Sequence, residues 1–457
     1  MEMKLTSREL IDTLNGEVIT YGEKGSIQGV ETDTRRLGEN FIFFALKGAR
    51  VDGNDMVDEA VKNGAILCVV DKYKEEFKKY EKKITIVKVE NTKEALYKLA
   101  EYYRNKFDIK VIGITGSTGK TSTKDILSGA LSEKFSVFKT IGNFNSDIGL
   151  PLMIFKFKDE HEVAVLEMGM SGFGEIELLA KIARPDIAII TNIGESHLEQ
   201  LKTRENILKA KMEITKYFNE KNVLIINNDN DMLRTIDEER FEIIPCSIQG
   251  NGKLNSDILD INISESFFKI TNGEYNGETF NLKMPGEHNI SNALLSIAVC
   301  EIVGMTSEEI NSGLKKIDKT SMRLDIKKHE EGGYIIINDA YNASPDSMKA
   351  AIDVMNTIQG KKICVLGTMK ELGEKSSELH REIGEYALEQ GVEKLFVVGE
   401  GSQNYLSGFA DREGYVFKTK EDLIQKLKGE LTAEHVVLIK ASRSMKFETI
   451  YNELIMN

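Results

Sequence analysis

Short apolar runs alternate with amphipathic segments along most of the chain, and this alternation predicts an α/β protein. Near the amino end, the runs Phe41–Leu46 and Ala65–Val70 have the composition of buried strands. Ser7 is expected to cap a helix over Arg8–Leu14, because a serine hydroxyl can bind the free N–H groups of a first helical turn. These elements predict a small α/β domain that extends to about residue 106.

From about residue 107 to 318 the alternation becomes regular, which is typical of a mostly parallel sheet with helices on both faces. Two of its predicted strands lead to polar residues: Val163–Glu167 ends in a carboxylate, and Ile187–Asn192 is followed by His197. A further strand is predicted over Val223–Asp229. Residues 251–281 are rich in Gly, Asn and Ser, and we interpret them as hairpins at the sheet edge.

Residues 319–457 predict a second, Rossmann-like sheet. Its strands are expected at Tyr334–Asp339, Lys362–Gly367, Leu395–Gly399 and Val436–Lys440. The segment has no Gly-x-Gly-x-x-Gly fingerprint, so its loops 339–342 and 440–443 are expected to close over a nucleotide bound by the central domain. Since 457 residues exceed a single core, we expect two to four domains, and the pattern along the chain divides it into 1–106, 107–318 and 319–457.

A glycine-rich segment between the apolar run Val111–Ile114 and a helix over Lys124–Leu131 predicts a phosphate loop. Its residues are Thr115, Gly116, Ser117, Thr118, Gly119, Lys120, Thr121 and Ser122. Glycines allow backbone N–H groups to surround an anion, and the helix N-terminus adds positive potential. Lys120 can span the β- and γ-phosphates and Thr121 can offer its hydroxyl to Mg²⁺, so we expect ATP here. The strict motif has a glycine where this chain has Ile114, so a chance turn is the alternative. The flanking strand and helix argue against that alternative.

Glu167 and His197 follow strands of the central domain, and the carboxyl ends of parallel strands meet at one edge of a sheet. Glu167 together with Thr121 is a common arrangement for holding the Mg²⁺ of a nucleotide. Taken singly, Glu167 could equally be a solvated residue at a strand end, and His197 could equally be a packed loop histidine, as either could be a metal ligand. Together with Thr121 they favour a metal site. Lys211 lies in a helix predicted over Arg204–Tyr217, where pattern alone makes a lysine a surface residue.

Two polar clusters of the amino-terminal domain combine cations with turn-forming residues. Thr32–Arg36 and Lys47–Asn54 suit a substrate that carries phosphates and hydroxyls, and ordinary solvated turns are the alternative. Asn289 and Asn292 stand near the start of a helix predicted over Ala293–Val303. There they can either cap the helix or bind the edge of a purine.

Composition limits the partners of this chain. Its formal net charge of −13 argues against nucleic acid or an anionic membrane as the main partner. The four cysteines lie far apart and form no Cys-x-x-Cys pair, so we expect them to be reduced, without a zinc site or a disulfide framework. The sequence has no apolar run of about 18 residues, no signal-peptide pattern and no heptads, so we expect a cytoplasmic monomer.

Five segments beyond the phosphate loop resemble signatures of the Mur ligase family: Gly142–Pro151, Glu167–Ile176, Thr191–His197, Asn338–Met348 and Val437–Met445. The resemblance covers essentially the whole chain. It implies a domain that binds a UDP-sugar substrate, a central P-loop ATPase domain and a Rossmann-like carboxy-terminal domain. Within the family, the chain is most similar to the ligases that join D-alanyl-D-alanine to UDP-N-acetylmuramoyl-tripeptide, a peptidoglycan precursor, through an acyl phosphate.

The resemblance also implies catalytic roles. Lys211 matches the lysine that these ligases carbamylate, which replaces the surface interpretation given above. Lys120, His197 and Arg323 are the other implied catalytic residues. The implied ligands of two Mg²⁺ ions are Thr121, Glu167, His197 and carbamylated Lys211.

Further residues are matched to parts of the substrates. Asn289 and Asn292 match adenine contacts, and Asp339 matches the contact to the ribose. Arg323 matches the arginine that reaches the γ-phosphate from the domain junction. The implied residues for the UDP-linked peptide and the dipeptide are Thr32, Asp33, Thr34, Arg35, Lys47, Gly48, Asn143, Asn145, Asn342, Ser442 and Arg443.

Three carboxy-terminal residues, Ser344, Thr368 and Ala441, depart from the usual pattern of the family. They put the amine substrate in question, so a Mur-type ligase with another amine or carboxylate, such as a folylpolyglutamate synthase, is the nearest alternative. A small-molecule kinase and a non-enzymatic nucleotide switch are rivals from other classes. The sequence does not predict whether the third residue of the tripeptide is diaminopimelate or lysine.

Overall fold

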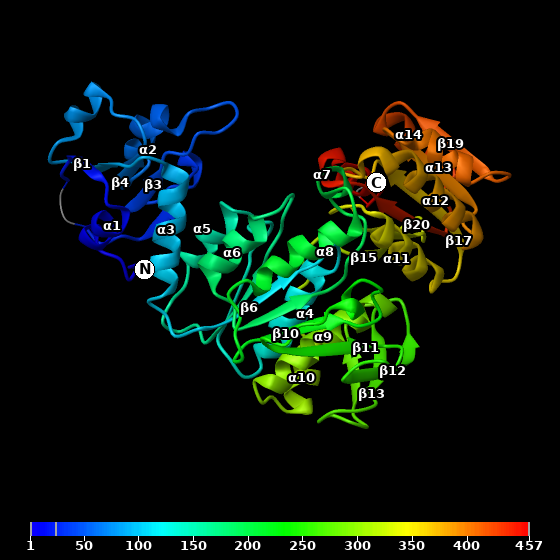
Figure 1. Ribbon diagram of the computed structural model, residues 1–457. Coiled ribbons are helices and arrows are strands. Elements are labelled where there is room, and N and C mark those ends of the chain that lie inside the picture. Colours follow the sequence, from blue (N-terminus) through cyan, green and yellow to red (C-terminus); the bar gives the residue numbers. More distant parts are fainter. Residues whose placement is uncertain (1, 23–24, 456–457) are drawn as a thin grey trace. The chain divides into compact units, whose positions relative to one another are not determined.

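The structure of the protein is a computed structural model that describes residues 2–22 and 25–455 (Figure 1). The described residues form three sheets, of five, nine and six strands, which confirms the predicted α/β class. They divide into two compact units. The first comprises residues up to 113, 135–169 and 175–186, and the second comprises 114–134, 170–174 and the chain from 187 onward. The domain boundaries near 106 and 318 remain predictions.

The amino-terminal sheet of the first unit has the strand order β1-β5-β4-β3-β2, in which only β1 runs antiparallel to its neighbour. Its elements are α1 (Ser7–Leu14), β1 (Glu17–Thr20), β2 (Gly29–Glu31), β3 (Phe41–Phe44), α2 (Val57–Lys62), β4 (Ala65–Val70), β5 (Thr85–Lys88) and α3 (Thr92–Arg104). The prediction that Ser7 caps α1 is wrong. The Thr6 side chain accepts the N–H of Glu9 and the Glu9 carboxylate accepts the N–H of Thr6, so a capping box begins one residue earlier.

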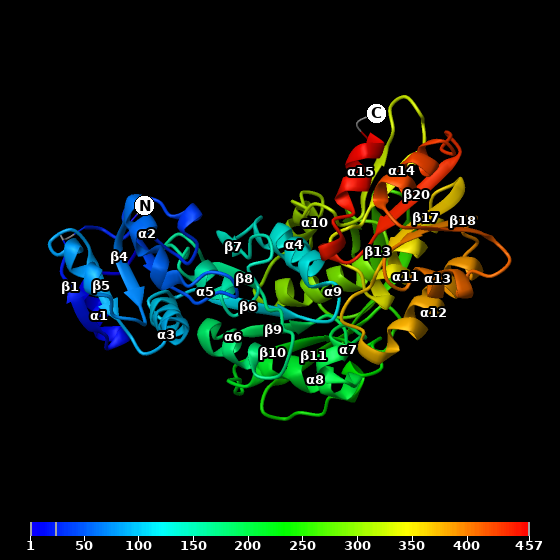
Figure 2. The ribbon, with the colours of Figure 1, turned by 90° about the horizontal axis from the view of Figure 1, so that it is seen from above.

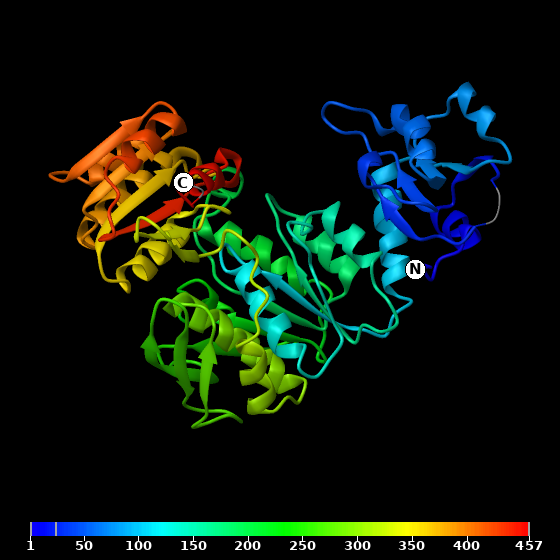
Figure 3. The same cartoon turned by 180° about the vertical axis from the view of Figure 1, so that it is seen from behind.

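The rest of the first unit surrounds β8, which has its predicted bounds and pairs in parallel with β7. Its elements are β6 (Lys110–Thr115), at whose end the two units divide, β7 (Val137–Lys139), α5 (Gly149–Ile154), β8 (Val163–Glu167) and α6 (Glu175–Ala183). Helix α3 contacts β3, α5 and α6 (Figure 3, where α3 is the cyan helix beside the blue sheet). The buried guanidinium of Arg104, at the end of α3, donates hydrogen bonds to the carbonyls of Phe107, Ile109 and Ala183. One side chain therefore fixes the segment between α3 and β6.

The second unit starts at the phosphate loop and continues with helices and strands that alternate as predicted. Its first elements are α4 (Lys120–Leu131), β9 (Ile187–Ile190), α7 (Leu198–Leu201), α8 (Arg204–Met212), β10 (Val223–Asn227), β11 (Glu242–Ser247), β12 (Leu254–Ile261), β13 (Ser266–Ile270), β14 (Thr279–Leu282), α9 (Glu287–Ile302) and α10 (Ser307–Leu314). Strands β9 to β12 are parallel neighbours, whereas β12, β13 and β14 form an antiparallel ladder. The hairpins predicted over 251–281 are therefore confirmed.

Helix α8 is shorter than predicted. It ends at Met212, and Glu213–Thr215 continues as a tighter 3-10 turn. The Thr215 hydroxyl donates a hydrogen bond to the carbonyl of Met212, and the Glu213 carboxylate accepts the N–H of Gly174. Such side-chain bonds to the backbone compete with helical bonds, so the helix ends here.

The carboxy-terminal sheet has the strand order β15-β16-β20-β17-β18-β19, in which only β15 is antiparallel to its neighbour. Its elements are β15 (Asp325–Lys328), β16 (Ile335–Asn338), α11 (Pro345–Asn356), β17 (Lys361–Gly367), α12 (Ser376–Glu389), β18 (Lys394–Val398), α13 (Ser402–Gly408), β19 (Glu413–Phe417), α14 (Lys420–Lys428), β20 (His435–Lys440) and α15 (Glu448–Ile455). Helices α14 and α15 lie on one face, and α11, α12 and α13 on the other (Figure 2). The predicted Rossmann-like arrangement is confirmed, with two half-exposed edge strands that the sequence did not reveal.

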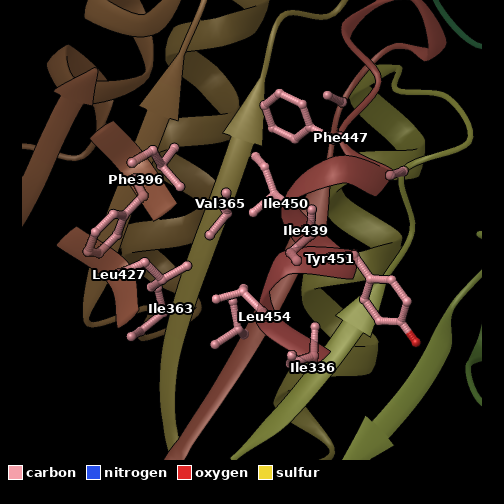
Figure 4. Close-up of a cluster of buried hydrophobic side chains, with 14 of the residues drawn as sticks. Ile336, Ile363, Val365, Phe396, Leu427, Ile439, Phe447, Ile450, Tyr451 and Leu454 are labelled. Atoms are coloured by element: carbon pink, nitrogen blue, oxygen red, sulfur yellow. The ribbon is translucent and has the colours of Figure 1, made fainter. Parts of the chain in front are cut away.

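A hydrophobic core between the sheet and helices α14 and α15 holds the carboxy-terminal segment together. Figure 4 shows Ile363, Val365 and Phe396 of the sheet facing Ile450 and Leu454 of α15. Phe396 is fully buried, and its ring centroid lies 5.7 Å from that of Phe417 on the neighbouring strand. Alternate residues of each strand enter this core and the others are buried by the helices on the opposite face, so the inner strands are continuous apolar runs.

We predict that Phe396→Ala lowers the free energy of unfolding of this segment by about 3–5 kcal/mol, because it leaves a cavity in a close-packed core. Val416→Ala on β19 is the control, since Val416 is 41% exposed and should change stability by about 0.5 kcal/mol or less. Urea unfolding followed by circular dichroism measures both variants. Equal shifts in the two midpoints would contradict the assigned core.

Four free cysteines are buried in the described structure, as expected for reduced, structural residues. Cys68 lies in β4, Cys246 in β11, Cys300 in α9 and Cys364 in β17. Burial raises the pKa of each thiol above its ordinary value. None of the helices in residues 2–22 and 25–455 has the length and apolarity that a membrane crossing requires.

Candidate active site

The phosphate loop, residues 116–119, depends on two glycines with positive φ angles. Gly116 has φ of 152° and Gly119 has φ of 78°, conformations that residues with a side chain rarely adopt. A Cβ at Gly116 would lie 1.8 Å from Oγ1 of Thr191, and a Cβ at Gly119 would lie 2.8 Å from Oδ1 of Asn292. The loop leads directly into the N-terminus of α4, so its backbone N–H groups can bind an anion.

Two residues that follow β9 hold this loop in shape. Asn192 accepts the N–H of Thr118 at 2.8 Å and donates through Nδ2 to Oγ1 of the same residue at 2.7 Å. The carbonyl of Asn192 accepts the N–H of Ser117 at 3.0 Å. Thr191 donates its hydroxyl to the carbonyl of Thr118. These bonds form the loop before a ligand arrives, so binding costs little ordering.

The loop opens into a cavity of about 220 Å³ that gathers most of the predicted ATP residues. Ser117, Thr118, Gly119, Lys120, Thr121, Ser122, Asn292, Arg323, Asp339 and Asn342 line it. Lys120 donates to the carbonyl of Gly116 at 2.7 Å. Nη2 of Arg323 donates to Oγ1 of Thr121 at 3.2 Å, and its guanidinium lies 4.2 Å from the ring centroid of Tyr341. Two cations therefore flank the position where phosphates bind.

Asp339 and Lys440 form a buried ion pair at the carboxyl ends of the neighbouring parallel strands β16 and β20. The other oxygen of Asp339, Oδ1, accepts the N–H of Leu324 at 3.2 Å. Lys440 also donates to the carbonyl of Asn342 at 2.9 Å. Burial lowers the pKa of Lys440, and the adjacent carboxylate opposes that shift. The pair holds loop 339–342 at the cavity that the phosphate loop lines.

Asn289 and Asn292 lie inside the first turns of α9. Asn289 donates to the carbonyl of Pro285 at 2.8 Å, and its Oδ1 accepts a bond from Asn292 at 3.4 Å. The N-cap position is Gly286, which offers no side chain. The capping interpretation of the two asparagines is therefore wrong. Asn292 reaches the cavity, whereas Asn289 is fully buried behind it.

A second hollow, of about 290 Å³, adjoins the phosphate loop and contains the residues predicted for the dipeptide. Ser117, Lys120, His197, Asn342, Ser442 and Arg443 are among those that line it. The hydroxyl of Ser442 accepts the N–H of Lys370 at 2.9 Å, which orients it. Arg443 is half exposed and pairs with Glu448 at 2.7 Å. The two hollows share Ser117 and Lys120, so a group at the phosphate loop is reached from both.

His197 contacts Glu371, whose Oε2 lies 2.5 Å from Nδ1 of the imidazole. The pair lowers the pKa of Glu371. A backbone bond from the N–H of Glu199 to the carbonyl of Glu371, at 3.1 Å, supports the same contact. Both residues of the pair have a φ of 66°. Since Nδ1 faces Glu371, Nε2 is the ring nitrogen that remains for another ligand.

Lys211 is buried, with 1% of its side chain exposed. Burial, and then the charge of Lys120, lowers its pKa well below the ordinary value, and no carboxylate among the described residues offsets this effect. The surface interpretation from pattern alone is therefore wrong. Ile207, Ala210 and Lys211 have the i, i+3, i+4 spacing of one helix face, and that face of α8 is buried.

Glu167 and Asn145 come together in the first unit. Oε1 of Glu167 accepts a bond from Nδ2 of Asn145 at 2.7 Å, and its N–H donates to Oγ1 of Thr140 at 3.0 Å. Asn143 lies in the same loop and is exposed. The predicted approach of Glu167 to Thr121 joins residues of different units and remains a prediction.

The first amino-terminal cluster is internally bonded. Arg35 and Asp33 form an ion pair at 2.6 Å, which lowers the pKa of Asp33 to about 2. Thr34 is buried and donates to Glu59 at 2.8 Å. Thr32 is partly exposed beside this pair. Their role in binding a substrate remains a prediction.

The second amino-terminal cluster is exposed from Lys47 to Val51 and ends in the buried residues Gly53 and Asn54. Lys47 and Gly48 lie at its start, where Lys47 forms a backbone bridge with Asp52. Arg36, the last residue of the first cluster, lies 5.2 Å from the ring centroid of Phe144, which stands between Asn143 and Asn145. This cation–π contact joins the amino-terminal cluster to the loop that carries two predicted substrate residues.

Lys440, Glu371 and His288 were not predicted as site residues from the sequence. A signal for Lys440 was present, because two predicted strands end in Asp339 and Lys440, and opposite charges at the ends of parallel strands are candidates for a pair. His288 lines the nucleotide cavity, and burial lowers its pKa to about 4, so it is neutral near pH 7. Glu371 gave no local signal, since its partner lies far away in sequence.

Fold and site together define a P-loop nucleotide-binding protein with a second hollow beside the phosphate loop. Three family models match the chain: "Mur ligase family, catalytic domain" at residues 26–104, "Mur ligase middle domain" at 114–300 and "Mur ligase, glutamate ligase domain" at 322–443. A relative from Bacillus subtilis (strain 168), named UDP-N-acetylmuramoyl-tripeptide--D-alanyl-D-alanine ligase, is 37% identical over 99% of both chains. The chain belongs to the Mur ligase family. A protein of the same name from Escherichia coli (strain K12) is 32% identical over 99% of this chain and 98% of its own.

Solved structures support the same conclusion. MurF from Acinetobacter baumannii superposes with a TM-score of 0.89 at 28% identity and full coverage of both chains. MurF ligase from Thermotoga maritima, solved in complex with ADP, has a TM-score of 0.83 at 31% identity, over 94% of this chain and 97% of its own. The predicted three-domain Mur ligase architecture is confirmed. A folylpolyglutamate synthase from Thermotoga maritima, at 15% identity and a TM-score of 0.57 over 79% of this chain and 93% of its own, shares the fold alone.

We predict that Gly116→Ala lowers affinity for ADP at least about tenfold, because the new Cβ meets Thr191 and distorts the loop. Gly277→Ala is the matched control, since Gly277 also has a positive φ, of 92°, but lies in a hairpin with open space around its Cα. Isothermal titration calorimetry with ADP compares the two. An unchanged affinity in the Gly116 variant would show that the loop does not bind the nucleotide.

Proposed function

We propose that this protein is an ATP-dependent ligase that joins D-alanyl-D-alanine to UDP-N-acetylmuramoyl-tripeptide, with ADP and phosphate as the other products. The names of the relatives from Bacillus subtilis and Escherichia coli state this pair of substrates. The observation that carries the proposal is the meeting of two hollows at one phosphate loop. One contains Arg323 and Asp339, the other contains His197 and Arg443, and Lys120 belongs to both.

The chemistry explains why such a ligase needs ATP. A carboxylate and an amine at neutral pH form a salt, because oxide is too poor a leaving group for an amide to form. An oxygen of the peptide carboxylate therefore bonds to the γ-phosphorus of ATP while the bond from that phosphorus to ADP breaks. The amine nitrogen of the dipeptide then bonds to the carbonyl carbon, the bond to phosphate breaks, and the amine loses a proton.

The first step forces one anion onto another, so the site must neutralise several negative charges. Lys120 at the start of α4 and Arg323 at Thr121 flank the phosphate position from two sides. Cations that are already in place stabilise the charge of the transferred group without reorganisation. Asp339, held by Lys440, is suited to accept bonds from ribose hydroxyls, and the ADP complex of the Thermotoga relative supports nucleotide binding.

The second step takes place where the two hollows meet. Arg443 carries a guanidinium that suits the carboxylate of a dipeptide, and Asn342 stands between the hollows. Ser442 is oriented by the N–H of Lys370, so its hydroxyl is ready to donate. An acyl phosphate hydrolyses in water, so a closed arrangement around it favours the amine.

The residues present fit Mg²⁺. Thr121 and Glu167 offer oxygen ligands, and a carbamate on Lys211 would add two more, which is the donor type that Mg²⁺ prefers. The burial of Lys211 without a carboxylate partner supports the carbamate, since CO₂ reacts with a neutral amine and the product is an anion beside Lys120. Thr121, His197 and this carbamate from the second unit, with Glu167 from the first, are the residues that would hold two Mg²⁺ ions, which would add positive charge at the phosphates.

We also propose that the protein acts in the cytoplasm as a monomer. The four free, buried cysteines fit a reducing compartment. The site residues predicted for the UDP-linked peptide lie in the first unit and those for the dipeptide in the second, so one chain supplies both sets.

We predict that phosphate release from ATP and Mg²⁺ requires both UDP-N-acetylmuramoyl-tripeptide and D-alanyl-D-alanine. The expected product is the UDP-linked pentapeptide, detected by mass spectrometry. A ligase of the same fold with another substrate would respond to other amines, a kinase would accumulate a stable phosphorylated product without any amine, and a switch would bind ATP without turnover. Each of these results would replace the proposed substrates.

We predict that Lys211→Ala lowers turnover at least about a hundredfold, because the carbamate and the ion that it holds are lost. Lys209→Ala is the matched control, since Lys209 lies two residues earlier on α8 and is exposed. With ¹³C-labelled bicarbonate, the unaltered protein and the Lys209 variant should show a carbamate carbon signal that the Lys211 variant lacks. A signal that persists in the Lys211 variant would assign the carbamate elsewhere.

A further inference from the structure

Two charged residues of α4 lie one turn after the phosphate loop and are almost completely buried. Lys124 is 1% exposed and Asp125 is 4% exposed. Their side chains approach each other at 3.2 Å. Burying two charges costs free energy that a pair of apolar residues would not, so a specific task is expected for them.

Both side chains bind Thr320, in the linker between α10 and β15. Oδ2 of Asp125 accepts the backbone N–H of Thr320 at 2.8 Å. Nζ of Lys124 donates a longer bond, of 3.5 Å, to the hydroxyl of the same residue. The pair is therefore hydrogen-bonded to the linker three residues before Arg323.

The linker adopts an unusual backbone around Arg323. Met322 and Leu324, on either side, have φ angles of 62° and 46°, which are costly for residues with side chains. The N–H of Leu324 is held by Asp339, and the carbonyl of Met322 accepts the N–H of Tyr341 at 3.3 Å. The strained segment is thus fixed at its far end as well.

One face of α4 receives both the linker and the arginine. Thr121, which accepts the bond from Arg323, and Asp125, which binds Thr320, are four residues apart and lie on the same helix face. Nε of Arg323 is buried and has no hydrogen-bond partner among the described residues, so a donor remains for a ligand. A ligand oxygen beside the Thr121 hydroxyl belongs to the β- or γ-phosphate end of a nucleotide.

We propose that Asp125, supported by Lys124, is a positioning residue that fixes the linker on α4 so that Arg323 reaches the γ-phosphate of ATP. The proposal rests on ATP as the substrate of the proposed function. Asp125 acts through Arg323 and does not touch the nucleotide itself. Loss of Asp125 therefore weakens binding of a triphosphate and leaves binding of a diphosphate intact.

The first test compares two nucleotides in the full-length protein. Calorimetry measures the affinity for ADP and for a non-hydrolysable ATP analogue. Asp125→Ala is expected to lower the affinity for the analogue at least about tenfold, as loss of a charged hydrogen bond predicts, and the affinity for ADP less than about twofold. Asp257→Ala, at an exposed position of β12, is the control and should change neither affinity. Thr320→Val keeps the N–H that Asp125 binds, so it should lower the affinity for the analogue less than Asp125→Ala does.

The second test asks whether Asp125 acts through the arginine. In an Arg323→Ala background, Asp125→Ala should cause no further loss of affinity for the analogue, so the two effects should not add. Equal losses for ADP and the analogue, additive losses, or no loss at all would each overturn the proposal. If Asp125→Ala does not fold, Asp125→Asn, which keeps the shape and loses the charge, is compared in the same way. None of these measurements uses the peptide or the dipeptide, so a failed ligase assay leaves their outcome unaffected.

Discussion

The phosphate loop keeps its shape because the residues after a neighbouring strand bind its backbone, and the other parts of the site are arranged around that loop. Asn192 satisfies both the N–H and the hydroxyl of Thr118, and Thr191 binds the carbonyl of the same residue. Gly116 must lack a side chain because Thr191 occupies the space. Lys120 and Thr121 follow at the start of α4, so their directions are fixed by a helix that begins at a fixed loop. The positions of Lys120 and Thr121 in the nucleotide cavity therefore depend on the shape of this loop.

Lys124, Lys211 and Lys440 of the second unit are each only 1% exposed, and their surroundings differ. Lys440 pairs with Asp339 and Lys124 approaches Asp125, so each of these two amines lies next to a carboxylate. Lys211 has no carboxylate to offset its burial among the described residues, and its pKa falls accordingly. A buried amine in this state is either neutral or chemically converted to an anion. Among these three lysines, Lys211 is therefore the one whose buried amine has no carboxylate to offset its burial.

The sequence predicted the elements whose pattern is strong and local, and β4 and β8 have their predicted bounds because both are apolar runs bounded by turns. Strands β15 and β19 were missed because they are half-exposed edges with no apolar run to detect. The prediction for the cap of α1 was wrong by one residue, since both Thr6 and Ser7 can cap and only the reciprocal bond with Glu9 decides. Site residues inside one motif were predictable from their chemistry. Contacts such as Asp125 with Thr320 were not, because they join distant positions whose proximity depends on the whole fold.

The four buried thiols can report local opening of the regions in which they lie. One cysteine lies in the amino-terminal sheet, two lie in the central part of the second unit, and one lies in the carboxy-terminal sheet. A thiol with a raised pKa inside a core reacts with an alkylating reagent only while its surroundings are transiently open. The rate at which Cys68, Cys246, Cys300 and Cys364 become labelled therefore measures the opening free energy of each region in the unaltered protein. Ligands that tighten one region would slow the labelling of its own cysteine and leave the others unchanged.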